Sequence, residues 1–125
     1  MEESNIDIVE VVDKSWEMTY DEYDSESGKL YEAQCKFELS SEEDAVIYDL
    51  EVPEEISNQG IGTKMIEIAE QIIIDQTDAQ YMYAQIGARN GATKHVLSNK
   101  FGYDIVGTED RDVLGKVFDA EKKIR

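Results

Sequence analysis

The apolar residues of this sequence first change their spacing at Gly60. Before Gly60 they mostly alternate with polar residues, which is the repeat of a β-strand with one face buried. After Gly60 the spacing becomes that of an amphipathic helix, set by Ile61, Met65, Ile68 and Ile72. A half made of strands, followed by helices and strands in turn, predicts a mixed sheet with helices packed on it.

Three or four strands are predicted before the change of spacing. Ile6 to Tyr20 reads as one long strand or two short ones. After a turn at Asp24 to Gly28, the segment Tyr31 to Leu39 alternates cleanly and places Cys35 on the buried face. Ala45 to Val52 is apolar enough to be a central strand.

The second half predicts a helix from Gly60 to about Ile74 and a shorter one after it. Its remaining elements are expected at Ala79 to Ile86 (strand), Ala92 to Phe101 (helix), Tyr103 to Thr108 (strand) and Val113 to Ala120 (strand). The chain has 125 residues, and two cores would each be of marginal size, so we expect one domain over residues 1–125.

The charge is strongly acidic, with 29 Asp and Glu against 12 Lys and Arg and a net charge of −17. Such a chain repels a nucleic-acid backbone, so nucleic acid is not an expected partner. The acids are spread along the sequence, as on a solvated surface. This is typical either of a protein adapted to concentrated salt or of an ordinary acidic surface that aids solubility.

Cys35 is the only cysteine, which excludes an intrachain disulfide and leaves no Cys/His cluster for zinc. We therefore expect a reducing cytoplasm and no metal. Met1 to Asp7 does not resemble a signal peptide, and no apolar run approaches the ~20 residues that cross a bilayer. No membrane association is expected.

A loop from Val52 to Thr63 joins the central strand to the helix and contains Gly60 and Gly62. Glycines let the backbone approach a ligand closely, and the unpaired N–H groups at a helix start attract anions such as phosphate. Turn geometry alone would also explain the two glycines. No Gly-Lys-Ser/Thr follows, so the loop is not a P-loop.

Two ordered motifs resemble those of the GNAT superfamily of N-acetyltransferases. Leu50-x-Val52-Pro53, then six residues, then Gly60-Ile61-Gly62 resembles the acetyl-coenzyme A loop. Asn90 to Tyr103 (NGATKHVLSNKFGY), followed by Gly107, resembles the second motif. The resemblance covers about Ala45 to Val106 and implies a single α/β (α+β) GNAT-like domain. Its mixed central sheet would have splayed middle strands and flanking helices, with an N-terminal half made mostly of strands.

The resemblance also implies a site for acetyl-coenzyme A. Leu50 and Val52 would contact the pantetheine arm, Lys64 would add positive charge, and Asn90 leads the second motif. The pyrophosphate would be held by the backbone N–H groups of Gln59, Gly60, Ile61, Gly62 and Thr63.

The sequence departs from the family pattern in two places. Ser57 stands where Arg or Gln is usual, three residues before the first glycine. The position of the usual tyrosine general acid falls on Ser98 when counted from Gly102 and on Leu97 when counted from Asn90, and neither side chain protonates a thiolate well. Relatives that lack this tyrosine are expected to use water.

Acetyl transfer to an amine requires a base and a donor for the developing oxyanion. Glu51 and Asp49 lie on the same parity of the central strand and are the candidate bases, with Glu51 favoured because it is nearer the strand's end. The Val52 N–H is the candidate oxyanion donor. Either carboxylate could instead be an ordinary solvated side chain.

The leading hypothesis is an N-acetyltransferase that transfers acetyl directly to a small-molecule or peptide amine, with a cationic amine favoured by the acidic charge. The alternative is a GNAT-fold binding or regulatory module with weakened catalysis. It is favoured by the missing tyrosine, Ser57 and a first half without helices. A homodimer whose partner completes the cleft is a third possibility.

Overall fold

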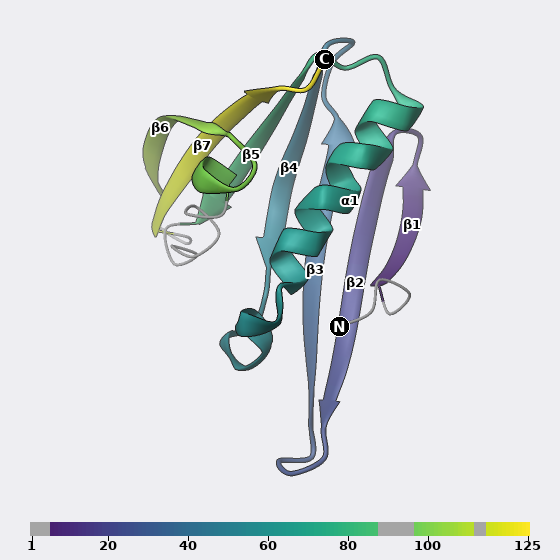
Figure 1. Cartoon of the computed structure of the whole chain (residues 1–125), viewed down its shortest axis with the longest axis vertical. Helices are drawn as coiled ribbons and strands as arrows, with labels where there is room; N and C mark the ends of the chain where they lie inside the picture. The colour runs from purple at the N-terminus through teal and green to yellow at the C-terminus, as the bar shows by residue number, and fades with distance from the viewer. Residues whose placement is uncertain (1–5, 88–96, 112–114) are drawn as a thin grey trace.

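The structure is a computed structural model that describes residues 6–87, 97–111 and 115–125. Its seven-stranded sheet has the order β1-β2-β3-β4-β5-β7-β6, and helix α1 (Ile61–Gln76) lies across one face of it (Figure 1). The central strand β4 (Asp44–Glu51) runs parallel to β5 (Tyr81–Gly87), while the other neighbouring strands are antiparallel. The predicted mixed sheet with β4 at its centre is thereby confirmed.

The N-terminal half is a meander of strands, as expected. The segment from Ile6 to Tyr20, which the sequence left open as one strand or two, belongs to two strands, β1 (Ile6–Val12) and β2 (Ser15–Asp24). They are separate because Lys14, between them, adopts a left-handed turn conformation with φ 59°. A long hairpin joins β2 to β3 (Lys29–Leu39) and projects past the N-terminal end of α1 (Figure 1). Within residues 6–53 the chain forms no helix.

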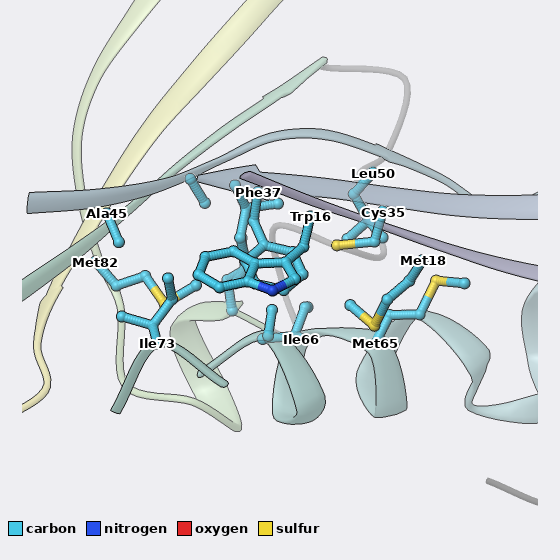
Figure 2. Packing of buried hydrophobic residues seen from close by; sticks show 14 of the residues in the cluster. Trp16, Met18, Cys35, Phe37, Ala45, Leu50, Met65, Ile66, Ile73 and Met82 are labelled. Atoms are coloured by element: carbon cyan, nitrogen blue, oxygen red, sulfur yellow. The ribbon is translucent and has the colours of Figure 1, made fainter. Parts of the chain in front are cut away.

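The core lies between α1 and the sheet (Figure 2). Trp16 and Phe37 from neighbouring strands stack with ring centroids 5.3 Å apart. Cys35 is fully buried beside them, and this burial raises the pKa of its thiol well above the usual value. Cys35 is therefore a small core residue, as the alternation predicted, because a thiol that keeps its proton is a poor nucleophile.

The buried face of α1 differs from the predicted stripe. Ile61 and Met65 are buried as expected, but Ile68 and Ile72 are only half-buried at the margin of the helix. The positions that complete the buried face are Ile66, Ala69 and Ile73. Ile66 and Ile73 offer an alternative helical stripe, and the direction in which α1 crosses the sheet decided between the two.

The C-terminal elements match their predictions to within about three residues. β6 (Asp104–Arg111) and β7 (Gly115–Lys123) close the sheet, with β7 inserted between β5 and β6. The strand expected at Ala79 to Ile86 begins at Tyr81. Of the shorter helix, residues 97–99 are helical and residues 88–96 lie outside the described part. No helix of the described chain is long and apolar enough to span a membrane.

Candidate cofactor and acetyl-transfer site

The two parallel strands at the centre of the sheet separate along their length. Their ladder runs from Asp44 opposite Tyr81 to Ile47 opposite Ala84, although β4 continues to Glu51 and β5 to Gly87. Figure 1 shows β4 and β5 diverging toward their carboxyl ends. The predicted splay of the middle strands is confirmed, and β5 does not pair with the last residues of β4.

A β-bulge decides which way the last side chains of β4 point. Lys36 of β3 lies opposite Asp49, but the next residue of β3 lies opposite Ile47, so Tyr48 is an extra residue in β4. Ile47 and Leu50 are both buried under α1. Strict alternation from Ile47 would have buried Asp49 as well. The bulge reverses the parity and brings the carboxylates to the opposite face of the sheet.

The side chain of Gln34 connects the two candidate bases. Its Nε2 donates to Oδ2 of Asp49 at 3.0 Å and to Oε2 of Glu51 at 3.2 Å. Lys36 Nζ lies 4.0 Å from Asp49 Oδ2 and 3.8 Å from Glu17 Oε1. The shared face predicted for Asp49 and Glu51 is therefore observed.

The two carboxylates differ in their surroundings. Asp49 is half-buried and faces the ammonium group of Lys36, while Glu51 is exposed at the end of β4. Sequence reasoning missed Gln34 and Lys36. The sequence did contain a signal for them. Gln34 and Lys36 alternate with the buried residues of β3, so they lie on the face of the sheet to which the bulge turns Asp49 and Glu51.

The loop after β4 shapes the start of α1. A 3₁₀ helix, Glu54–Gln59, follows Pro53, and Gly60 then takes a left-handed conformation with φ 78° as the N-cap residue of α1. This conformation favours glycine, because a Cβ atom is strained there. The first hydrogen bond of the helix runs from Lys64 N to Gly60 O at 3.0 Å.

Helix geometry therefore leaves the N–H groups of residues 61–63 without intrahelical acceptors, and no side chain of the described residues caps them. Gly62 packs against the end of the central strand, and a Cβ added to it would lie 3.4 Å from Val52 Cγ2. Aligned N–H groups beside the divergence of β4 and β5 form a ready site for an anion.

The side chains around this helix start are mostly acidic or neutral. Gln59 Nε2 donates to Glu22 Oε2 at 2.9 Å, which ties the loop to the β2–β3 hairpin. Lys64 Nζ lies 3.6 Å from Glu67 Oε2, so part of the positive charge that the sequence assigned to the site is balanced within α1. The attraction for an anion rests mainly on backbone dipoles.

The second motif is only partly described. Asn90 and the lone His95 lie outside the described residues. Leu97 is 1% exposed, and its carbonyl accepts a hydrogen bond from Tyr103 N at 2.9 Å, so Leu97 is a core residue. Ser98 is half-buried. Of the two positions left open for the missing tyrosine, only Ser98 carries a hydroxyl group.

A contact that the sequence did not suggest joins α1 to the end of the second motif. Lys122 Nζ of β7 lies 3.0 Å from Glu70 Oε1 and sits over the rings of Phe101 and Tyr103, at 5.8 and 5.5 Å from their centroids. The Tyr103 hydroxyl is buried without a hydrogen-bond partner among the described residues. Burial and the nearby Glu70 carboxylate raise the pKa of Tyr103, so it keeps its proton and serves packing.

Comparison by structure finds acetyltransferases. Nourseothricin acetyltransferase superposes with a TM-score of 0.68 at 15% identity, over 94% of this chain and 70% of that one. The IAA acetyltransferase of Bacillus cereus gives 0.67 at 12% identity, over 89% and 79%. A GNAT family acetyltransferase of Elizabethkingia anophelis with acetyl-CoA bound gives 0.62 at 12% identity, over 87% and 74%.

No protein-family model matches the sequence, and no curated protein is significantly similar to it. The chain spans 66% of the length of the matched Thermoplasma volcanium Ard1 structure. At these identities the superpositions establish the fold, and the chain has the fold of the GNAT acetyltransferases.

Proposed function

We propose that this protein is a GNAT N-acetyltransferase that transfers the acetyl group of acetyl-coenzyme A directly to an amine. The observation that carries the proposal is the divergence of β4 and β5 beside a helix start capped by Gly60, with Glu51 at the end of β4. The Elizabethkingia protein of the same fold binds acetyl-CoA. The site residues fit that cofactor, because a pyrophosphate needs donors and the start of α1 supplies backbone N–H groups.

In this proposal Leu50 and Val52 hold the pantetheine arm, while Asn90, which is outside the described residues, stays a prediction from the sequence. The backbone N–H groups of Gln59, Gly60, Ile61, Gly62 and Thr63 hold the pyrophosphate, with a smaller contribution from Lys64. The cofactor supplies an acetyl group activated as a thioester. The Val52 N–H would donate to the acetyl oxygen as negative charge develops there.

Glu51 removes the proton that the amine must lose, directly or through a water molecule. Asp49 is the second candidate, but Lys36 already engages it. The departing thiolate would take its proton from water, with the Ser98 hydroxyl as the weaker candidate donor. The acceptor is a small-molecule or peptide amine, and the acidic surface favours a cationic one. The buried, unpaired Cys35 suits a cytoplasmic protein.

The first test follows thiol release from acetyl-coenzyme A in the presence of polyamines, aminoglycosides and peptide N-termini. An enzyme should show at least one amine that raises the rate well above thioester hydrolysis. The rate should climb with pH until the amine and the base are both deprotonated. Thiol release that no amine accelerates, although the cofactor binds, would contradict the proposal.

That outcome would favour the second candidate function, a binding or regulatory module that has kept the cofactor site. Two observations support it: Leu97 and Ser98 stand where a tyrosine acid is usual, and residues 6–53 provide no helix to wall an acceptor cleft.

We also propose that the acidic surface is an adaptation to concentrated salt. The melting temperature should then rise steeply between dilute buffer and molar potassium chloride, because screening relieves repulsion within a net charge of −17. Each kcal/mol of relieved repulsion raises the melting temperature of a domain this size by about 4 °C. Thermal unfolding followed by circular dichroism measures this. A flat melting temperature would indicate an ordinary acidic surface.

A further inference from the structure

β1 is an edge strand with an unusually apolar exposed surface. It is the first strand in the sheet order, so no other described strand pairs with one side of its backbone. Ile8, Val9, Val11 and Val12 are 42, 58, 51 and 67% exposed. Proteins usually protect such edges with Lys, Pro or a covering element, and β1 contains no Lys or Pro.

The apolar surface of β1 continues onto α1. A groove of about 260 Å³ between the two elements is lined by Ile8 together with Ile68 and Ile72, the two helix residues that the core leaves half-buried. Polar side chains of Lys64, Glu67 and Gln71 form its rim. An exposed edge beside an apolar groove is the kind of surface that a further β-strand can extend.

The opposite edge of the sheet is different. It is formed by β6, whose eight residues include Asp104, Glu109, Asp110 and Arg111. Charged residues oppose strand addition. Of the two edges of the described sheet, β1 is the less charged, with Asp7 and Glu10 among its seven residues.

We propose that a second copy of this chain pairs with β1 antiparallel, about a two-fold axis through Ile8, so that the two sheets become continuous. The ladder between β1 and β2 is regular from Ile6 to Glu10 and shifts before Val12. This regular segment is the part that can accept another strand in register. A two-fold axis normal to the sheet also keeps both α1 helices on the same face.

The choice of Ile8 follows from the charges. An axis through Asp7 or Glu10 would set identical acids opposite each other, which is destabilising. An axis through Val9 would extend the pairing into the irregular part of β1. An axis through Ile8 sets Ile8 against the partner's Ile8, Asp7 against the partner's Val9, and Ile6 against the partner's Glu10.

This register suits a second copy because every acid then faces an aliphatic residue, while the two Ile8 side chains meet between the two grooves. Each copy has a net charge of −17, so long-range repulsion opposes the association and salt relieves it. The dimer is independent of the proposed chemistry, since β1 is separated from β4 by two strands.

Sedimentation equilibrium of the whole chain tests the dimer. The dissociation constant should fall as potassium chloride rises from 0.1 to 2 M. Ile8→Lys should raise it by more than about thirtyfold, the scale of an interface hot spot. Val12→Lys is the control, because it makes the same charge change at a 67% exposed site beyond the regular ladder. A monomer at every salt concentration would overturn the proposal and leave the edge to a different partner.

A cross-link tests the register. Opposed residues of antiparallel strands have Cα atoms about 4.5–5.5 Å apart, within the range of a disulfide. Ile8→Cys should therefore form a covalent dimer on mild oxidation, and Val12→Cys should not. The buried Cys35 does not compete. Cross-linking that is equal at the two positions, or a dimer that Ile8→Lys leaves intact, would refute the pairing through Ile8.

Discussion

Gly62→Glu is expected to abolish coenzyme A binding while the protein still unfolds cooperatively. Gly62 lies in the first turn of α1, where the N–H groups of residues 61–63 lack intrahelical acceptors. A Cβ at this position would already touch Val52 Cγ2 at 3.4 Å. The rest of a Glu side chain would have to extend toward the anion site, bringing a negative charge to the place where the pyrophosphate is proposed to bind.

The fold should tolerate the change. Glycine is a poor helix residue, and a carboxylate in the first turn of a helix interacts favourably with the helix dipole. We therefore expect the dissociation constant for coenzyme A, measured by calorimetry, to rise by more than about a hundredfold, which corresponds to ~2.7 kcal/mol. Gly62→Ala should have a smaller effect, because it adds the contact with Val52 without the charge.

Gln76→Glu is the matched control for charge. It places the same carboxylate at the last residue of α1, about 21 Å from Gly62 along the helix axis. Coenzyme A should bind this variant nearly as tightly as the wild-type protein. If Gly62→Glu also binds within a factor of about three of the wild type, the pyrophosphate site does not lie at the start of α1.

Glu51→Gln is expected to lower turnover with the best amine by roughly a hundredfold or more, the usual scale for the loss of a general base. The substitution preserves the shape of the side chain and removes its ability to take a proton. Coenzyme A affinity should not change, because none of the proposed contacts to the cofactor uses the Glu51 side chain. Initial rates and calorimetry on the same sample separate the two effects.

Glu38→Gln is the control for this experiment. Glu38 lies on the same face of the sheet, paired with Val46 at the other end of the β3–β4 ladder, so its loss removes the same charge away from the end of β4. It should leave turnover nearly unchanged. Wild-type turnover in Glu51→Gln would show that Glu51 is not the general base. The candidates would then be Asp49 and a water held by backbone groups.

Local pattern was enough to predict most of the fold. The alternation from Tyr31 to Leu39 predicted β3 and the burial of Cys35, and the apolar run at Ala45 to Val52 predicted the central strand. These predictions held because successive side chains of a strand point to opposite faces, which is a local property of the chain. Burial of one face then fixes which residues are apolar. The start of α1 was also predicted from a local property, because Gly60 adopts a left-handed conformation that suits glycine.

Tertiary structure decided what the local pattern left ambiguous. The extra residue Tyr48 in β4 exists only in relation to β3, yet it determines that Asp49 and Glu51 leave the core and meet Gln34. The buried face of α1 depended on how the helix crosses the sheet, which left Ile68 and Ile72 beside β1. In each case the position of a residue depends on a partner that is distant in sequence, and periodicity along one segment holds no information about that partner.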